Sequence, residues 1–333
     1  MKRQFAAELV PGTRVDDIFV ISEKAVAQKK NGENYLNFTF ADKTGEIKGV
    51  AWDNVPTVTA AGGVGDFVRV QGGVSEYRGA LQLTVQELSP VDRETVRRDD
   101  FLPTTRRNPE RMMARLRQTA AEGIQDPDLR ALFAAFWSDA DFVERFKHAP
   151  AGKKMHHAYL GGLLEHTLSM TLLVREIAAH YSGIDTDILL AGTILHDIGK
   201  IYEFQYDTII EYSDEGRLLT HIVIGCGMLE EKLRQVPGFP PEKALLLKHM
   251  IVSHHGSREF GSPEPPRTLE AVLLNHIDDI DAKMNGLREF IAREDPRESW
   301  TGYNPMLRRR IFRSGKVGSP LPGTESPEEN SEE

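Results

Sequence analysis

The chain has 333 residues, of which 40% are hydrophobic and 27% are charged, as in an ordinary soluble protein of about two domains. Its formal net charge of -9 excludes a surface that is basic overall, so contacts with nucleic acid would have to come from local patches. No apolar run is long enough to span a membrane, and the N-terminus lacks the apolar core of a signal peptide. The single cysteine, Cys226, excludes an internal disulfide, and we expect a reducing, cytoplasmic setting.

Residues 14–90 are predicted to form five short β-strands. These strands are rich in Val, Phe and Thr, alternate in part between apolar and polar residues, and are separated by turns such as KKNGEN and ADKTGE. Five strands of this size predict a small closed barrel. The segment resembles the OB-fold, which binds single strands through exposed aromatic residues and through the loops between strands one and two and between strands four and five.

If the barrel binds single-stranded RNA or DNA, aromatic rings and loop cations should make the contacts. The candidates are Tyr35, Phe38, Phe40, Trp52 and Tyr77, with Lys29, Lys30 and Arg78 on the loops. The alternative for each ring is packing in the core, because alternation puts Phe38 and Phe40 on one face, which can be the barrel interior. The two lysines can equally belong to a solvated loop.

The rest of the chain is predicted to be helical. Residues 1–90 would form the barrel domain, 91–108 a charged linker, and 109–313 an all-α domain, which makes the protein a multidomain α+β chain. Helices are expected after the N-caps Asn108 and Asp126, then at about 157–181, 185–197, 219–235, 240–255 and 267–292, with a short hairpin within 203–217. The acidic tail, 314–333, is rich in Ser, Pro, Gly and Glu and is predicted to be disordered.

The stretch at 189–200, LLAGTILHDIGK, is the most informative part of the sequence. An apolar helical run ends in His196, Asp197 and Lys200, and burial of an unpaired carboxylate there would be very unfavourable. A divalent metal ion is the natural partner for the adjacent histidine and aspartate. Gly199 is predicted to end the helix in a left-handed conformation, with Lys200 directed toward the same opening. The alternative is a helix end with ordinary surface charges.

All but one of the 11 histidines lie at or after His156, and several separate predicted elements carry groups that can bind a metal. These groups are His166, His196 with Asp197, His221, His249, His254 with His255, and Asp278 with Asp279 and Asp281. A lone helical histidine is usually structural. Several in one helical domain make independent structural explanations less plausible. We interpret His249, Asp279 and His276 as structural.

The order of these residues resembles the H…HD…D pattern of the HD-domain phosphohydrolases. The resemblance implies two metal ions bridged by Asp197, one also bound by His166, His196 and Asp278, the other by His221, His254 and His255. Lys200 matches the lysine of the HDxxK motif and would stabilise charge on the phosphate oxygens. Two metals can share a hydroxide that attacks phosphorus in line. Imidazole and carboxylate ligands favour Mn²⁺, Fe²⁺, Co²⁺ or Zn²⁺.

Two assignments near this motif have open alternatives. Adjacent residues on a regular helix diverge by about 100°, so His254 and His255 can both reach a metal only if the helix frays, which Gly256 would permit. Asp281 lies one turn beyond Asp278 and can either contact substrate or support a ligand, and the supporting role is slightly favoured.

Longer segments narrow the resemblance to one family. HHAYLGGLLEH, YSDEGRLLTHIVIG, KHMIVSHHG and LNHIDDIDAKMN, together with the barrel and DFLPTT in the linker, resemble the YhaM family of bacterial 3′→5′ exoribonucleases over about residues 10–313. The resemblance implies metal-dependent, often Mn²⁺-dependent, removal of nucleoside 5′-monophosphates from single-stranded 3′ ends. His156 and His157 would lie where substrate phosphate is held, or alternatively would pack at a helix N-terminus.

Two other functions remain as hypotheses. The same metals could hydrolyse a small or cyclic nucleotide, or the HD site could be vestigial in a binding protein, which the complete ligand set disfavours. Because the chain is acidic, Arg308, Arg309, Arg310 and the linker arginines would have to provide the basic surface that a nuclease needs. The sequence does not determine the native metal, the preference for RNA or DNA as substrate, or the processivity. It also does not determine whether the protein forms a homo-oligomer.

Overall fold

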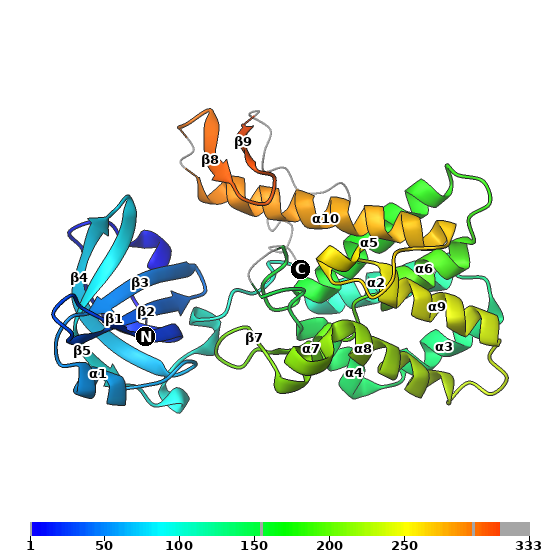
Figure 1. Cartoon of the computed structure of the whole chain (residues 1–333). Helices are drawn as coiled ribbons and strands as arrows, with labels where there is room; N and C mark the ends of the chain where they lie inside the picture. The colour runs from blue at the N-terminus through cyan, green and yellow to red at the C-terminus, as the bar shows by residue number, and fades with distance from the viewer. Residues whose placement is uncertain (1, 154–155, 295–296, 314–333) are drawn as a thin grey trace, which may run out of the picture.

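The computed structural model describes residues 2–153, 156–294 and 297–313. It consists of an N-terminal β-barrel and a C-terminal helical part, joined by a segment with two short 3-10 turns, as Figure 1 shows. This confirms the predicted architecture of an OB-type barrel followed by helices. The predicted disordered tail, 314–333, lies outside the described residues. Among the described helices, none is both long and apolar enough to cross a membrane.

The barrel is closed by five strands in the order β1-β2-β3-β5-β4. The pair β3 and β5 is parallel and the other pairs are antiparallel. The strands are β1 (Arg14–Gln28), β2 (Asn34–Asp42), β3 (Gly45–Ala51), β4 (Phe67–Tyr77) and β5 (Ala80–Pro90), with the helix α1 (Val55–Ala60) between β3 and β4. Alternate strand residues fill the interior, as period-two patterning requires.

Phe38 and Phe40 both belong to this interior. Their rings stack with centroids 5.2 Å apart, and they are 2% and 0% exposed. Of the two interpretations of these rings, the structure therefore favours packing in the core, and Phe38 lacks the exposure that stacking on a base would need.

Nine helices make up the described helical part. They are α2 (Pro109–Gly123), α3 (Pro127–Trp137), α4 (Ala140–His148), α5 (Gly162–Ala178), α6 (Thr186–Leu195), α7 (Lys200–Glu203), α8 (Asp214–Leu233), α9 (Pro241–Ser253) and α10 (Leu269–Arg293). Polar side chains cap the first turns of several of them, including the predicted Asn108 and Asp126. Such caps satisfy backbone N–H groups that have no partner within the helix.

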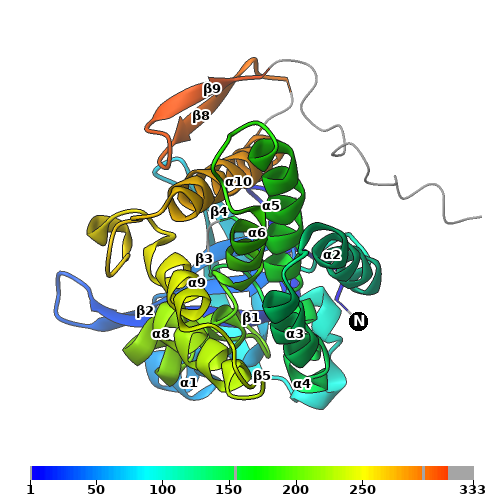
Figure 2. The same ribbon diagram turned by 90° about the vertical axis from the view of Figure 1, so that its right-hand side faces the viewer.

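Helix α6 is the centre of the helical part. All of its residues from Ile188 to Leu195 are buried, and α5, α9 and α10 contact it (Figure 2). A helix that is apolar on every side can only lie in a core. The end of α6 therefore places His196 and Asp197 deep in the protein.

The sequence was less informative about the ends of elements and about short strands. The helix expected from residue 157 begins at Gly162, because His157 and Gly161 both have positive φ. The predicted hairpin is present as β6 (Phe204–Gln205) and β7 (Glu211–Tyr212). A second hairpin, β8 (Trp300–Asn304) and β9 (Arg309–Phe312), was not predicted, so this part of the chain is not all-α.

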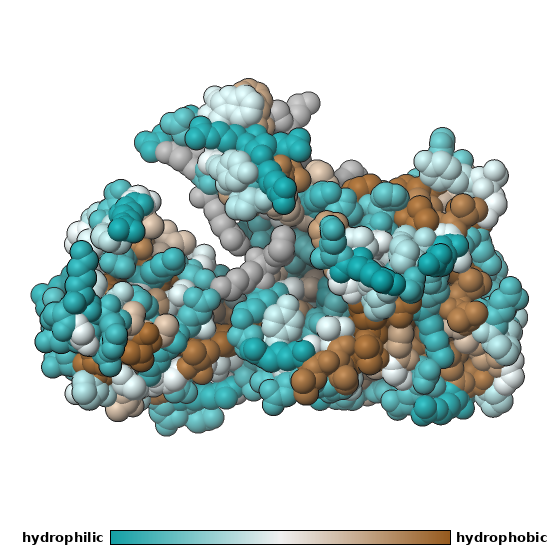
Figure 3. Space-filling model, in the orientation of Figure 1, coloured by the Kyte–Doolittle hydropathy of each residue, from teal (hydrophilic) through white to brown (hydrophobic). Residues whose placement is uncertain are grey.

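The barrel and the helical part meet at a small apolar cluster. Val20 and Phe67 of the barrel pack with Phe101 of the linker, and Ile209 in the β6–β7 turn packs against them. Beside this contact is a cavity of about 880 Å³ that residues of both parts line. The space-filling view shows a hollow between the barrel and the projecting β8–β9 hairpin, and below this hollow the barrel and the helical part touch (Figure 3).

Gly199 does not end its helix in the left-handed region, since its φ is -63°. It is needed instead for close packing of α7 on α8, where a Cβ atom would lie 2.0 Å from the carbonyl oxygen of His221. We expect Gly199→Ala to lower the free energy of unfolding by about 1–3 kcal/mol, as overpacking does. Chemical denaturation followed by circular dichroism measures this.

Gly227 in α8 is the matched control, because a Cβ atom there would meet nothing within 4 Å. Gly227→Ala should be neutral or stabilising by up to about 1 kcal/mol. Equal unfolding midpoints for the two variants would show that the α7–α8 contact is not as tight as described.

Candidate metal centre

Seven side chains from five helices or their ends converge on one buried point of the helical part. His166 lies on α5, His221 on α8 and Asp278 on α10, while the other four follow directly after α6 and α9. Those four are His196, Asp197, His254 and His255. The structure thus brings together every residue that the sequence predicted as a metal ligand.

Three of these residues form a first group with one oxygen of Asp197. Nε2 of His166 lies 3.3 Å from Nε2 of His196 and 3.3 Å from Oδ1 of Asp278. Nε2 of His196 lies 3.2 Å from Oδ2 of Asp197. Ligand atoms of His166, His196 and Asp197 all lie within 4.8 Å of one another, close enough for a single cation, and Asp278 adjoins this set through His166.

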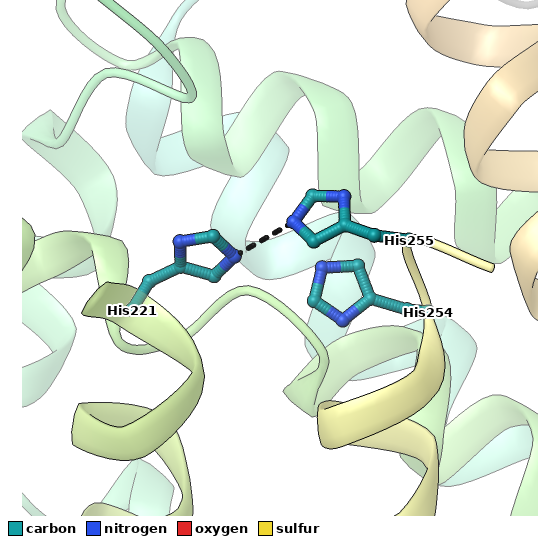
Figure 4. A group of neighbouring side chains, drawn as sticks. All are labelled: His221, His254 and His255. Carbon is teal, nitrogen blue, oxygen red and sulfur yellow. Dashed lines mark hydrogen bonds between the residues drawn. The ribbon is translucent and has the colours of Figure 1, made fainter. Parts of the chain in front are cut away.

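The remaining three histidines form a second group with the other oxygen. Oδ1 of Asp197 lies 3.5 Å from Nε2 of His254 and 3.6 Å from Nε2 of His221. Nε2 of His221 lies 3.1 Å from Nε2 of His255, and Figure 4 shows the three rings turned toward one another. His255 joins His254 here because α9 ends at Ser253 and the chain turns at Gly256, whose φ is +79°.

Asp197 therefore faces both groups, one oxygen to each. Its Oδ1 and Nε2 of His254 are buried and have no hydrogen-bond partner within the described residues. Buried polar atoms without a partner are rare, and an ion is one of the recognised explanations. The imidazole and carboxylate donors suit a divalent transition metal, so the residues present fit metal ions at this point.

Contacts of the Nδ1 atoms fix the orientations of four of the ligand rings. Nδ1 of His196 and of His254 lie 2.8 and 2.7 Å from backbone carbonyl oxygens of their own helices. Nδ1 of His221 lies 2.9 Å from Oε1 of Glu203, and Nδ1 of His166 lies 2.8 Å from Oδ2 of Asp281. An imidazole that donates its Nδ1–H in this way presents the Nε2 lone pair, which is the arrangement usual for metal-binding histidines.

The charges around Asp197 keep it ionised. Burial alone would raise the pKa of Asp197, but Lys200, whose Nζ lies 2.6 Å from Oδ2, and His196 hold this pKa well below its usual range. Burial would likewise lower the pKa of Lys200, yet the charge of Asp197 raises it. The carboxylate is thus available as an anionic ligand at all ordinary pH values.

The two ligand groups differ in the charges that surround their histidines. Burial would lower the pKa of His166, but Asp278 and Asp281 on either side raise it to about 10. Burial and the neighbouring His254 lower the pKa of His255 to about 2. The carboxylates beside His166 attract a cation to the first group, where the cation would replace the Nε2 proton of His166, while the second group is built from three imidazoles and one oxygen of Asp197.

His156, His157 and Asp281 lie beside the centre. His156 is half-buried, its ring is 5.9 Å from that of His166, and burial lowers its pKa to about 4. His157 is 3% exposed, and its ring nitrogens lie 2.9 Å from the Tyr159 hydroxyl and 3.0 Å from Oδ2 of Asp281. This placement favours a packing role for His157 over the expected substrate contact.

Asp281 likewise points at protein groups. Its Oδ1 accepts a hydrogen bond from Ser169 at 2.5 Å, and its Oδ2 lies between the imidazoles of His157 and His166. Of the two roles considered for Asp281, the structure favours support of a ligand and not contact with substrate.

The barrel candidates lie in two separate places. Tyr35 and Trp52 stack with centroids 4.7 Å apart near the β1–β2 turn, where Lys30 is exposed and Lys29 lies 3.3 Å from Glu33. Together these residues form a surface that combines an aromatic pair with cations, as single-strand sites do.

The second place is the end of the β4–β5 hairpin. The guanidinium of Arg78 lies 5.2 Å from the ring centroid of Tyr77, which is 55% exposed. Both residues line a groove of about 680 Å³ together with Lys24 and Lys48. The groove thus offers several cations and one accessible ring.

Two features of the centre were not predicted from the sequence. Glu203 accepts hydrogen bonds from both the backbone N–H and the ring of His221, and its position three residues after Lys200 could have suggested a shared helix turn. Thr220, just before His221, has φ 61° and ψ 160°, a region that is essentially restricted to glycine. No pattern in the sequence indicates this strained backbone.

Comparison with known proteins agrees with this geometry. Residues 163–283 match the family model of the HD domain, and residues 20–91 match that of the OB-fold nucleic acid binding domain. The first region contains every residue of both ligand groups, and the second covers most of the barrel.

Similar proteins are known from several bacteria, and each is named 3′-5′ exoribonuclease YhaM. The proteins of Bacillus velezensis and Bacillus subtilis are both 35% identical to this chain, over 288 and 290 residues, which is 86% of this chain and 90% of theirs. That of Halalkalibacterium halodurans is 32% identical over 311 residues, which is 93% of this chain and 96% of its own. The chain therefore belongs to the YhaM family of 3′-5′ exoribonucleases.

Proposed function

We propose that this protein is a metal-dependent 3′→5′ exoribonuclease that releases nucleoside 5′-monophosphates from single-stranded RNA. The observation that carries the proposal is the pair of ligand groups joined by Asp197, in a chain that also contains a barrel of the nucleic-acid-binding type. Membership of the YhaM family supports the direction and the substrate. A cytoplasmic location would suit such an enzyme.

We further propose that the two groups hold two Mn²⁺ ions, with Fe²⁺, Co²⁺ and Zn²⁺ as alternative divalent cations. His166, His196 and Asp278 would bind one cation, His221, His254 and His255 the other, and Asp197 both. Cations held in this way supply Lewis acidity and lower the pKa of a water molecule for attack on a phosphodiester. The burial of the ligands keeps bulk water from competing for the same positions.

The protein groups around the cations would orient the scissile phosphate. Lys200, on the first turn of α7, is held at 2.6 Å by Asp197, so its ammonium is fixed beside the centre. There it can stabilise charge that develops on a non-bridging phosphate oxygen. His156, whose lowered pKa keeps it neutral at pH 7, can accept or donate one hydrogen bond to the terminal nucleotide.

The barrel would hold the strand and deliver its 3′ end. The cavity of about 880 Å³ between barrel and helices is lined by Tyr159 near the metal centre and by Lys43 and Lys153 from the two parts. We propose that a single strand passes through this space, from the barrel toward Tyr159 and the ligands beyond it. We assign Tyr35, Trp52, Tyr77, Lys29, Lys30 and Arg78 to contacts with bases and phosphates outside the centre.

The direct test uses a 5′-labelled single-stranded RNA with Mn²⁺ and a chelator control. We expect a ladder of shortening labelled products that the chelator abolishes. Asp197→Asn should reduce the rate on the order of 10²-fold or more, because it removes the anionic ligand common to both groups. Intact RNA with hydrolysis of a simple phosphodiester in the same tube would instead mean that the substrate is a small nucleotide.

Asp279→Asn is the matched control for this substitution. Asp279 lies close to the centre in sequence, directly after the ligand Asp278 on α10, but its side chain is 53% exposed and forms an ion pair with Lys283. We expect full activity and an unchanged circular dichroism spectrum. A similar loss in both variants would show that removal of any carboxylate charge near the centre lowers activity, and would contradict a specific role of Asp197 as a ligand.

Glu203→Gln tests how the second group is organised. The substitution keeps the size of the side chain but weakens the acceptor that orients His221, so we expect Mn²⁺ affinity to fall about 10- to 100-fold. The midpoint of thermal unfolding measured against Mn²⁺ concentration reports this without reference to activity. Identical titrations of the variant and the native protein would contradict a positioning role for Glu203.

Tyr77→Ala tests the barrel. Loss of one stacked base should weaken RNA binding roughly 5- to 100-fold, with hydrolysis of a simple phosphodiester unchanged. The control is Tyr181→Ala, because Tyr181 is 56% exposed in the helical part and Tyr77 is 55% exposed. Fluorescence anisotropy with labelled RNA in chelator measures the affinity. Equal affinities of both variants would place the strand elsewhere on the barrel.

A further inference from the structure

The hairpin β8–β9 belongs to neither matched region, because the HD match ends at residue 283. It forms a two-stranded ribbon that projects from the end of α10, as Figure 1 shows. We define the arm as residues 297–313. Of its charged residues, five are arginines and one is a glutamate, in a chain whose net charge is -9.

One face of the arm carries three exposed aromatic rings. Arg310 and Phe312 are two residues apart on β9 and therefore lie on the same face. Their partners across the ribbon are Tyr303 and Trp300, and the register shift between these two keeps both on that face. Trp300, Tyr303 and Phe312 are 56%, 60% and 56% exposed.

The opposite face attaches the arm to the protein. Thr301 is 3% exposed, and its hydroxyl accepts a hydrogen bond across the ribbon from the backbone N–H of Ile311. The backbone N–H of Gly302 donates to Glu294 just after α10, and Met306 in the turn lies against Gly286 of the same helix. The arm is thus held in place from one side, and the aromatic face is left available.

Three neighbouring arginines of the arm expose their charges to solvent. Arg308, Arg309 and Arg310 are exposed, and none of the three forms an ion pair with an acidic side chain in the described parts of the chain. An unpaired arginine cluster beside exposed rings attracts a polyanion that also has flat apolar groups. Among macromolecules, single-stranded nucleic acid has this combination.

The position of the arm fits a strand that is being shortened at the metal centre. The arm begins shortly after Ala292 of α10, and Ala292 lines the cavity between the barrel and the helices. The space-filling view shows open space between the arm and the barrel (Figure 3). A strand that leaves this cavity on the side of α10 would meet the arm some nucleotides away from its 3′ end.

We propose that the arm is a second binding surface for single-stranded RNA, in which Trp300, Tyr303 and Phe312 stack on bases and Arg310 contacts the backbone. The proposal rests on the proposed function, since it names how the same substrate is held upstream of the cleaved bond. If the arm has this role, substitutions in it should weaken the binding of long RNA and leave the hydrolysis of short substrates unchanged.

The test uses the full chain with the double substitution Trp300→Ala and Tyr303→Ala. We expect affinity for a labelled oligo(U) RNA of about 20 nucleotides, measured by anisotropy in chelator, to fall roughly 5- to 100-fold. Arg310→Ala should lower the slope of log affinity against log salt concentration by about 0.7. With Mn²⁺, KM for the long RNA should rise while kcat and the hydrolysis of a simple phosphodiester stay unchanged.

The matched control for the rings is Phe260→Ala, because Phe260 is 76% exposed on a different loop of the helical part. Sedimentation of each protein separates RNA binding from self-association. Unchanged affinity for the long RNA in the double variant would overturn the proposal, and so would a change in molar mass, which would make the arm a contact between copies. If the native protein binds the RNA but does not shorten it, the proposed function is contradicted. The affinity measurement would still decide whether the arm binds RNA, because it does not depend on nuclease activity.

Discussion

The buried carboxylate of Asp197 is the constraint on which the helical part depends. It lies at 2% exposure among four imidazoles and one ammonium, and its two oxygens point to different ligand groups. Such a charge is tolerated in a protein interior only if its surroundings compensate it. Helix α6 has to be buried on all sides to bring the carboxylate there, and α5, α8, α9 and α10 must each contribute a side chain.

The supporting contacts show that the centre is organised in advance. Each ligand histidine with a defined Nδ1 partner is held by a backbone carbonyl or by a carboxylate, so the rings do not need to reorient when a cation binds. The strained backbone at Thr220 and the close approach at Gly199 both serve the position of His221. Local strain of this kind persists only where surrounding structure enforces it.

Much of the centre could be predicted from the sequence because its ligands are few, chemically distinctive and spaced in a familiar order. His166, His196–Asp197 and Asp278 stand out from apolar helical patterns. The supporting groups do not, since Glu203 looks like any surface glutamate, and the buried pair of His157 with Asp281 arises from a contact between distant segments. The barrel was predictable from alternation, but alternation alone could not tell that Phe38 points inward.

The arm was missed for a related reason. Its strands are only five and four residues long, and exposed arginines interrupt the apolar pattern by which strands are recognised. The same exposed arginines and rings make the folded arm a basic and aromatic surface. An acidic protein repels RNA at long range, so basic and aromatic groups gain influence when they are concentrated on a few projecting surfaces. The β1–β2 turn, the β4–β5 hairpin and the arm are three such surfaces, and a strand that touches more than one of them is held by their combined effective concentration.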